Sequence, residues 1–597
     1  MVHYKWTVLS NTTVGALLAS INSTIILISL PVIFRGLDIN PFQAGNFTLL
    51  IWVLLGYGVV TATLLVTVGR ISDMLGRARM YNMGFAIFAA GSVLLFLIPN
   101  SGTTGGIELV FFRIVQGVGG AFLLANSAAL LTDAFPHDER GKALGINQVA
   151  AIGGSVVGLV LGGILAGLGD THIGGLTVPA WRIIFLVSVP FSLFGTAWAY
   201  LKLHNIQAPT RGQSVDWVGN ILFGTGLTLL LVAVTYGLLP YGGQLMGWSN
   251  PWVGGGIVAG IGMLLLFLWV ETRVKDPMFR LHLFRIRAFA AGNFAGLLGS
   301  IARGGVMFML IIWFQGIWLP LHGYSFDQTP FWAGIYMLPM LGGFVVFGPL
   351  SGWLSDRFGA RYLASLGMAI GSVTFFLFLT LAYDFPYWQM GLLLFIQGSG
   401  MGMFAAPNTA AIMNAVPAEH RGAASGMRAT LQNAGMQVSM VIFFTIVITG
   451  LSTGLTGAVD SALLSANVSP SVATGLAHAV GSNPTGALFG AFLGVNPMTQ
   501  LPQSIQSVLP PVVFTREWFP HAIAPAFMQG LDLSFLIAGS FTAVAAVVSL
   551  LRGERYVHDE QAHVRATKSA ENSGTDPAAP DRSEVTTGTF PGTGAKK

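Results

Sequence analysis

The sequence predicts an all-α integral membrane protein whose fourteen transmembrane helices follow a 6 + 2 + 6 arrangement. Three observations lead to this prediction: a low content of charge, fourteen long apolar segments, and a repeat that relates the two ends of the chain. Charged residues make up 9% of the 597 residues, hydrophobic residues make up 53%, and the mean hydropathy is +0.69. Ordinary soluble domains contain about 25% charged residues. The bilayer must therefore replace water as the solvent for much of this chain.

Each predicted helix is a run of mostly apolar residues that is long enough to span a bilayer. A spanning helix needs about 20 residues, because each residue adds ~1.5 Å of rise and the hydrocarbon core is ~30 Å thick. The segments that meet this requirement are, in order, residues 11–34, 46–68, 80–98, 107–131, 143–168, 181–201, 217–239, 251–270, 288–319, 331–354, 362–382, 387–413, 423–449 and 532–551. The first segment is too long for a signal peptide and lacks a clear cleavage site, so we expect it to be helix 1.

Two segments outside the predicted helices have a distinct composition. Residues 450–531 separate the last two helices and are rich in Gly, Ala, Ser and Asn, with apolar stretches such as Ala487–Val495. A partly ordered cap over the outer mouth and an inserted spacer both fit this composition. Residues 552–597 are rich in Glu, Lys, Ser, Thr, Gly and Pro, so we expect this tail to be disordered.

The distribution of Lys and Arg predicts the orientation of the helices. On the side of the N-terminus lie 23 of these residues. Sixteen of them are in the N-terminal end and the loops, and seven are in the C-terminal tail. Arg35, Arg182 and Arg516 lie on the other side. Positively charged loops stay on the cytoplasmic side of a membrane. We therefore expect a multi-pass protein of the cytoplasmic (plasma) membrane with both termini in the cytoplasm.

Three short motifs recur at nearly one spacing along the chain. The pairs are Asp73 and Gly76 with Asp356 and Gly359 (356 − 73 = 283), Gln116-Gly117 with Gln397-Gly398 (397 − 116 = 281), and Arg140-Gly141 with Arg421-Gly422 (421 − 140 = 281). A direct tandem of six-helix units would repeat at about 200 residues, so the extra ~80 residues fit two inserted helices.

The repeat predicts how the chain is divided. The expected parts are an N-terminal six-helix bundle at 1–205, two inserted helices with a linker at 206–287, a C-terminal six-helix bundle at 288–551, and the tail at 552–597. Parallel half-repeats around a central cavity are typical of transporters, and their substrate site lies near the membrane midplane between the halves.

The loop between the second and third helices reads Gly69-x-x-x-Asp73-x-x-Gly76-Arg77. It resembles the signature loop of the major facilitator superfamily, and the fourteen helices resemble the drug:proton antiporter branch of that family. Further matches, in order, are Trp52 and Tyr57 in helix 2, Arg113-Ile-Val-Gln116-Gly117 in helix 4, Trp181-Arg182 before helix 6, and Glu271, Pro277, Leu283-Phe284 and Phe289 before helix 9. The resemblance implies a secondary active transporter that exports small hydrophobic or amphipathic molecules (multidrug-efflux type) by proton-coupled alternating access.

The signature loop and its second-half counterpart are candidate gating elements. Asp73 follows helix 2, Gly76 permits a tight turn, and arginines can bind carboxylates or helix-end carbonyls. Such a charge cluster can stabilise one state of a two-state interface. The candidate gating residues are Gly69, Asp73, Gly76, Arg77 and Arg79 in the first half and Asp356, Gly359 and Arg361 in the second. A loop whose arginines only fix the orientation of the helices remains the alternative.

Helix 5 carries glycines at a spacing of four residues, at Gly154, Gly158 and Gly162. Small residues at this spacing form a flat stripe on which another helix can pack closely. The stripe resembles the antiporter motif of the family, with Leu159 where the family has proline. We therefore expect close helix packing here without a proline-induced kink.

Three arginines fall within or near the ends of predicted helices: Arg113 in helix 4, Arg303 in helix 9 and Arg428 in helix 13. A charge at membrane depth costs about 2.5–3.5 kcal/mol on insertion scales, so each should face a cavity or a partner. The family resemblance implies that Arg113 relays protons or orders the site. Arg428 lies near a helix end, where its side chain can reach the interface.

The predicted helices contain no acid or histidine at mid-membrane, although the chain has 24 Asp and Glu and 11 His. The family carries an aspartate in helix 1 where this chain has Asn22, whose amide cannot titrate. Three functions remain open. The first is a proton-driven exporter that uses a peripheral acid such as Glu108 or Asp133. The second is a lipid or lipid-like carrier without ordinary proton antiport, and the third is a non-transporting sensor or assembly partner.

Polar and amphipathic side chains at membrane depth mark the candidate cavity and proton pathway, because they favour a cavity over lipid. They are Asn22, Thr24, Trp52, Tyr57, Arg113, Gln116, Asn293, Arg303 and Gln315. The embedded charges are positive and favour neutral, amphipathic or anionic cargo. The chain has no cysteine and no phosphate-binding or hydrolase motif, so we expect no metal, no cofactor, no enzyme activity and no nucleic-acid partner. The expected partners are the substrate and membrane lipids, and the expected state is a monomer.

Overall fold

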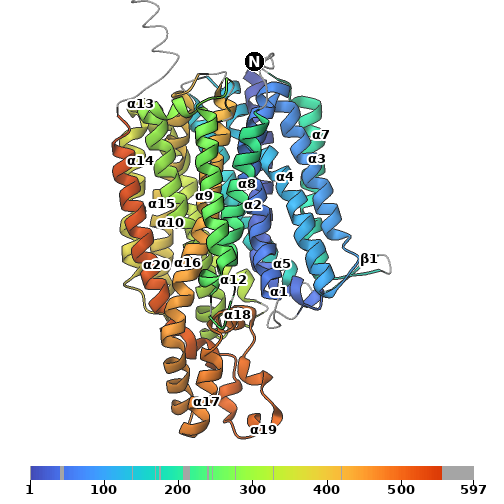
Figure 1. The fold of residues 1–597 in the computed structure, drawn as a ribbon, viewed down its shortest axis with the longest axis vertical. Helices are drawn as coiled ribbons and strands as arrows, with labels where there is room; N and C mark the ends of the chain where they lie inside the picture. The colour runs from blue at the N-terminus through green and yellow to red at the C-terminus, as the bar shows by residue number, and fades with distance from the viewer. Residues whose placement is uncertain are drawn as a thin grey trace, which may run out of the picture.

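Among the residues that the structure describes, fourteen helices are long and apolar enough to cross a membrane, which confirms the predicted all-α membrane fold. The computed structural model describes residues 2–39, 46–136, 139–167, 170–173, 176–205, 216–237, 239, 241–244, 246–275, 277, 279–326, 328–417 and 420–553. The helices stand side by side in an upright bundle (Figure 1). The tail predicted to be disordered, apart from Arg552 and Gly553, lies outside the described residues.

The first six spans are formed by α1 (Val2–Gly36), α2 (Asn46–Leu75), α3 (Arg77–Phe96), α4 (Gly102–Ala134), α5 (Arg140–Gly167) and the consecutive α6 (Ala180–Leu186) and α7 (Ser188–Lys202). A short antiparallel hairpin of β1 (Thr171–Ile173) and β2 (Leu176–Val178) precedes α6, with Thr171 opposite Val178. The two inserted spans are α8 (Trp217–Tyr236) and α9 (Pro251–Glu271).

The last six spans are α10 (Arg287–Trp313) with its continuation through η4 (Phe314–Trp318) and α11 (Leu319–Leu321), α12 (Thr329–Tyr336) with α13 (Leu338–Phe358), α14 (Ala360–Phe378), α15 (Tyr387–Asn414), α16 (Arg421–Ser465) and α20 (Trp518–Leu550). Three short helices lie between the last two spans: α17 (Pro470–Gly481), α18 (Pro484–Leu493) and α19 (Gln503–Gln506). Short 3-10 turns are η2 (Gly247–Ser249), η3 (Leu281–Arg285), η6 (Pro497–Gln500) and η7 (Pro511–Phe514).

Several helices are longer than predicted, and the difference is largest around the predicted loop 450–531. The helix predicted at 423–449 continues to Ser465, and the helix predicted at 532–551 begins at Trp518. An apolar stripe at four-residue spacing explains the first extension: Leu451, Leu455, Val459 and Leu463 are fully buried. The Gly, Ser and Thr residues between them lower the mean hydropathy without interrupting the stripe, so a prediction from average hydropathy ends too early.

The described chain begins and ends on the same side of the bundle. The N-terminus and the end of α20 lie at the top of Figure 1, whereas α17 and α19 project at the bottom. We call these two ends the N side and the α17 side. The segment between α16 and α20 is thus an ordered helical region on the α17 side.

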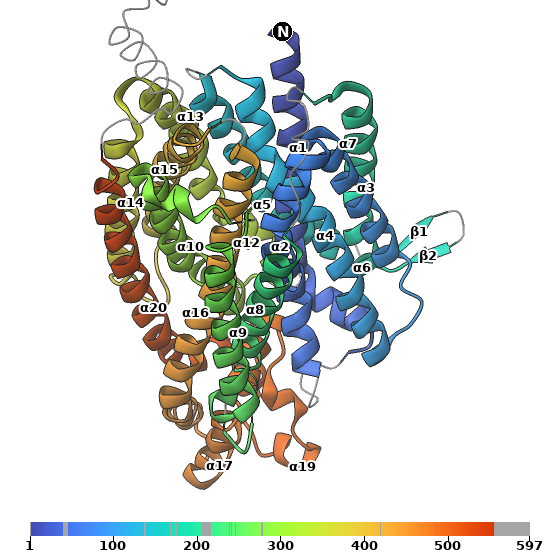
Figure 2. The same ribbon diagram turned by 45° about the horizontal axis from the view of Figure 1, so that its top comes forward.

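Two pairs of long helices join the two six-helix halves. On one side of the molecule α2 packs along α16, and on the other α5 packs along α13. The first contact is close enough that a Cβ on Gly426 would lie 3.0 Å from the carbonyl oxygen of Leu65. The inserted helices α8 and α9 pack against each other, and α8 contacts α2 and α16 from outside (Figure 2).

The glycine stripe of α5 faces the backbone of α1. A Cβ added to Gly154 would lie 2.6 Å from the oxygen of Leu17, and a Cβ on Gly158 would lie 2.6 Å from the oxygen of Ile21. At Gly162 the corresponding distance to the oxygen of Ile25 is 2.9 Å. The three glycines therefore allow the two helices to approach at a distance that any larger side chain would prevent.

Candidate functional site

A cavity of about 400 Å³ lies between the two halves of the molecule. Small-molecule sites in proteins usually have volumes of about 300–1,000 Å³. The first half supplies lining residues from α1, α2, α4 and α5, and the second half supplies them from α10, α13, α14, α15 and α16. Because both halves form its walls, any relative movement of the halves changes the shape of this cavity.

The two walls differ in chemistry. Both halves contribute hydroxyl and amide groups, from Ser20, Ser23, Thr24, Tyr57, Gln148 and Ser155 in the first half and from Ser300, Thr409, Gln432, Asn433 and Gln437 in the second, but the methionines of the described lining all come from the second half. The second half contributes six methionines: Met307, Met340, Met368, Met401, Met436 and Met440. Methionine is flexible and polarisable, so such a wall adapts to apolar groups of different shape.

Arg113 of α4 reaches this cavity from a buried position, with 1% of its surface exposed. Its Nη1 donates to the Oδ1 of Asn22 at 2.5 Å and to the Oε1 of Gln116 at 3.1 Å. Gln116 in turn donates to Ser92 at 2.8 Å, and the guanidinium lies 4.9 Å from the ring centre of Tyr57. These neutral partners orient the guanidinium but leave its positive charge uncompensated.

Arg303 of α10 also lines the cavity, and it comes from the opposite half. Within the described part of the chain, its guanidinium has no hydrogen-bond acceptor and no ion-pair partner. Arg428, the third embedded arginine, is outside the cavity lining and donates to the Oε1 of Gln432 at 2.9 Å. The structure thus brings two of the three predicted arginines to one cavity.

Several residues that the sequence places on the cavity have other environments. Trp52 packs near Tyr236 of α8, with the ring centres 6.4 Å apart. Asn293 donates to the carbonyl of Phe289, and Gln315 is buried in η4; neither lines the cavity. Whether a residue lines the cavity depends on its angular position around the helix axis. Its depth in the membrane does not reveal that position.

The remaining predicted residues divide between the cavity and its surroundings. Thr24 and Tyr57 line the cavity, and the Thr24 hydroxyl donates to the carbonyl of Ser155 at 2.8 Å. Asn22 and Gln116 lie behind Arg113 as its acceptors. Glu108 lies near the α17-side end of α4, where it accepts a bond from Asn100 at 2.6 Å, and it does not line the cavity.

Sequence reasoning missed most of the α16 face of the cavity. Gln432, Asn433, Met436, Gln437 and Met440 all line it. Their spacing of three and four residues places them on one helix face. That periodicity, with amides among the methionines, is a signal that a search of the sequence could have used.

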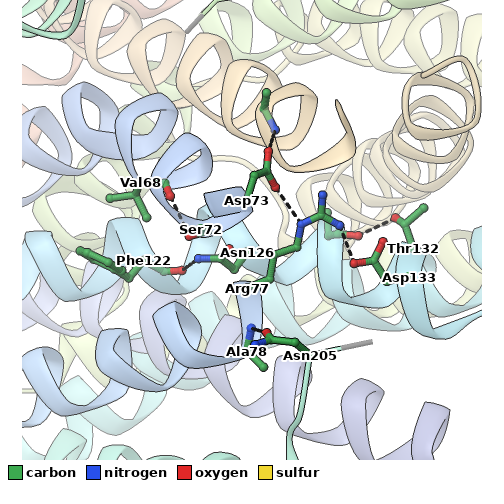
Figure 3. A network of polar contacts seen from close by, with 12 residues as sticks. Val68, Ser72, Asp73, Arg77, Ala78, Phe122, Asn126, Thr132, Asp133 and Asn205 are labelled. Atoms are coloured by element: carbon green, nitrogen blue, oxygen red, sulfur yellow. Dashed lines mark hydrogen bonds and ion pairs between the residues drawn. The ribbon is translucent and has the colours of Figure 1, made fainter. Parts of the chain in front are cut away.

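A second candidate element lies on the N side, where a cluster of acidic and basic side chains of the first half reaches the backbone of α16 in the second half (Figure 3). Asp73 accepts a bond from the Nε of Arg77 at 2.9 Å, and Arg77 also forms an ion pair with Asp133. The second carboxylate oxygen of Asp73 accepts a bond from the backbone N–H of Ala423 at 3.1 Å. We call Asp73, Arg77, Asp133 and the Ala423 N–H the N-side network.

The N-side network crosses the interface at the start of α16. Ala423 lies in the first turn of that helix, where backbone N–H groups have no partner within the helix and attract negative charge. A further bond between the halves runs from Arg140 of α5 to Asn414 of α15 at 3.2 Å. These bonds hold the N-side ends of the two halves together.

The tight turns predicted at both signature loops are present. Gly76 has φ +103° before α3, and Gly359 has φ +81° before α14, a conformation that favours glycine. The two loops differ in their arginines, because Arg361 donates to the carbonyl of Leu550 at the end of α20 at 2.9 Å. Arg79 is exposed, and the side chain of Asp356 lies outside the described residues.

Two groups beyond the spanning segments carry shifted pKa values. Burial lowers the pKa of Arg552 to about 10, and its guanidinium donates to the Oδ1 of Asn408. Asn408 also donates to the carbonyl of Gly292 at 3.1 Å, so this contact ties α20, α15 and α10 together. Burial and the charges of Arg280 and Arg285 lower the pKa of His282 and favour its neutral form.

The comparison with known protein families identifies the fold. The sequence profile described as Major Facilitator Superfamily matches residues 12–241 and 219–440. The chain belongs to this superfamily. The profile covers most of both halves, which agrees with the motif-based recognition and with the bundle around a central cavity.

Curated relatives of this superfamily member are transporters and resistance proteins. The riboflavin transporter RibZ of Clostridioides difficile is 28% identical over 74% of this chain and 87% of its own length. The tetracenomycin C resistance and export protein of Streptomyces glaucescens is 26% identical over 91% of both chains. The methylenomycin A resistance protein of Bacillus subtilis is 28% identical over 72% of this chain and 84% of its own.

Solved structures of superfamily members share the fold. A proton:xylose symporter, XylE, aligns with a TM-score of 0.52 at 14% identity and covers 91% of this chain and 95% of its own. A bacterial homologue of the lysosomal transporter Spinster aligns with a TM-score of 0.52 at 16% identity and covers 93% and 99%. Among the described residues, no group of three or more His, Cys, Asp or Glu side chains could hold a metal ion.

Replacing Asp73 by Asn is expected to favour opening of the N side. Asn offers one acceptor oxygen where Asp73 uses two, so either Arg77 or the Ala423 N–H loses its bond. Hydrogen bonds to charged groups contribute about 1.5–3 kcal/mol, so the ratio of open to closed molecules should rise about tenfold or more. The measurement is the rate at which a bulky maleimide labels Ala405→Cys on the cavity wall, since the natural chain has no cysteine.

The matched control for this experiment is Arg79→Gln in the same loop, because Arg79 is exposed. It should leave the labelling rate unchanged. Equal labelling rates for Asp73→Asn and the parent protein would show that the N-side network does not hold the halves together.

Proposed function

We propose that this superfamily member exports small hydrophobic or amphipathic molecules across the cytoplasmic membrane by alternating access. The observation that carries the proposal is the cavity between the halves, which has hydroxyl and amide groups on both walls and a methionine-rich wall in the second half. Its volume of about 400 Å³ suits a small molecule, and its apolar wall suits cargo without a fixed shape. The relatives that confer resistance to tetracenomycin C and methylenomycin A support export as the direction.

The proposed orientation places the N side in the cytoplasm. Arg77, Arg140 and Arg421 gather at that side, as does Lys5, which pairs with Glu139 at 2.5 Å. Lys and Arg residues are enriched in cytoplasmic loops of membrane proteins. The cavity would then load cargo when the N-side network is broken.

The proposed cycle depends on breaking and remaking the N-side network. With the network intact, Asp73 is held from both halves, and the cytoplasmic entrance is closed. When it breaks, α2 and α16 separate at that end while contacts on the α17 side close. Two packed arrangements of the same halves, separated by a few bonds, give the bistable element that a rocking transporter needs.

Proton coupling in this proposal uses an acid of the N-side network. Asp133 and Asp73 face both a mobile interface and arginines, and protonation of either carboxylate would weaken its bond to Arg77. Glu108, the other peripheral candidate, accepts a bond from Asn100 of the same half.

A second candidate function is a carrier for lipid-like molecules without ordinary proton antiport. The specific observation in its favour is the composition of the cavity lining, which contains no Asp, Glu or His among the described residues. Asn22 occupies the position where the family resemblance implies an aspartate, and it serves as an acceptor for Arg113.

Expression of the protein in a bacterium that lacks its main efflux pumps should raise resistance to amphipathic antibiotics. We expect the minimal inhibitory concentration of at least one amphipathic polyketide antibiotic to rise about fourfold or more, and Arg113→Ala to abolish the increase at equal membrane levels. The reason is that Arg113 fixes Asn22 and Gln116 and reaches the cavity. Normal membrane protein with no protection against any compound would refute the proposed export.

Proton flux distinguishes the two candidate functions. Proteoliposomes with an imposed pH gradient and an internal pH dye should lose the gradient faster when a transported compound is added. Asp133→Asn should slow this loss while compound still binds, because the variant removes a titratable partner of Arg77. Transport of compound with no proton movement in the parent protein would instead favour the uncoupled carrier.

A further inference from the structure

We propose that the central cavity binds amphipathic organic anions, with the negative group held between Arg113 and Arg303 and the apolar body against the methionine wall. This inference rests on the proposed function and deepens it by assigning the charge of the cargo. It starts from two guanidinium groups that reach one cavity from opposite halves.

Arg113 carries a charge that its surroundings orient but do not neutralise. Asn22 and Gln116 accept its hydrogen bonds through amide oxygens, which have no net charge. Its Nε is buried and has no acceptor among the described residues. A buried charge is stabilised well only by a charged partner with matching geometry, and a guanidinium matches a carboxylate, sulfonate or phosphate oxygen pair.

Arg303 shares its face of α10 with small residues. Gly296, Gly299 and Ser300 precede it on that face and also line the cavity. A Cβ on Gly296 would lie 3.1 Å from the Nε2 of Gln432, and a Cβ on Gly299 would lie 2.5 Å from the Cε of Met368, so two flexible side chains border this part of the cavity. Because Arg303 lines the cavity and has no partner among the described residues, its donors are available to cargo.

The packing places the two arginines at a similar depth. Arg113 lies over the ring of Tyr57, and the next residue, Gly58, abuts the side chain of Gln437. A Cβ on Gly304, the residue after Arg303, would lie 3.0 Å from the carbonyl oxygen of Met436. Since Met436 and Gln437 are adjacent on α16, both arginines lie near one level of the cavity.

The charge of the lining selects the class of cargo. Two positive charges face the cavity, and its described lining supplies no carboxylate to balance them. A cation would be repelled, and a neutral molecule would leave both charges without a partner. An anion with an apolar body can form ion pairs with both arginines and pack against the methionine side chains.

Three probes of one shape test this inference: naphthalene-2-sulfonate, naphthalene-2-sulfonamide and 2-naphthyltrimethylammonium. They share the aromatic body and carry a negative, zero and positive charge. We expect the full chain in lipid nanodiscs to bind the sulfonate at least about tenfold more tightly than the sulfonamide, with the cation weakest, after subtraction of binding to empty nanodiscs.

Substitutions assign the preference to the cavity arginines. Arg303→Gln should reduce the preference for the sulfonate about tenfold or more, and Arg303→Lys should retain most of it. Arg287→Gln is the matched control, because this arginine of the same helix is exposed and lies outside the cavity lining. Its preference among the probes should equal that of the parent protein.

Each remaining outcome overturns the inference. These outcomes are equal or tighter binding of the sulfonamide or the cation, no binding of any probe, and an unchanged preference in Arg303→Gln. Counterflow in proteoliposomes separates this failure from failure of the proposed function. Transport of the sulfonamide without the sulfonate would refute the anion preference and leave export intact, whereas sulfonate binding without any transport or antibiotic protection would refute export alone.

Discussion

The structure depends on the contact between two six-helix halves along α2 with α16 and α5 with α13. Small residues such as Gly426 bring the helix backbones together, and the N-side network closes one end of the interface. The carboxylate of Asp73 is central to this contact, because it accepts hydrogen bonds from its own half and from the first turn of α16. The cavity between the halves is lined by residues of both of these helix pairs.

Among the residues that the structure describes, charged side chains are paired at the N-side end of the interface and unpaired in the cavity. The closing network on the N side pairs its charges, with two carboxylates around Arg77. The cavity instead leaves Arg113 with neutral acceptors and Arg303 without a described partner. Paired charges at the entrance suit a contact that breaks and reforms, whereas unpaired charges in the cavity suit a site that cargo completes. In the proposed cycle, closure and recognition of cargo therefore lie in different places of the chain.

Sequence reasoning gave the fold because hydropathy and the repeat depend on the average properties of long segments. It also found Asp73, Arg77 and Asp133, although it did not foresee that Arg77 joins the two acids or that Asp73 reaches α16. It placed Trp52 in the cavity, but the direction in which a side chain leaves its helix depends on packing between distant helices. The part of α16 beyond residue 449 was missed for a different reason, because its stripe of leucines is diluted by small polar residues. Partial order in the segment after α16 was one of the two expected alternatives, and the apolar stretch Ala487–Val495 overlaps α18.

Distances measured across both ends of the interface test the account most directly. Leu75 and Phe358 are repeat-related positions on the N side, and Ile107 and Trp388 are repeat-related positions on the α17 side; all four are exposed. Cysteines at each pair in this cysteine-free chain can carry spin labels for pulsed distance measurements. Movement of two rigid halves about the cavity predicts that addition of a transported compound lengthens one distance while it shortens the other. A change at one end alone, or changes of the same sign at both ends, would contradict this account.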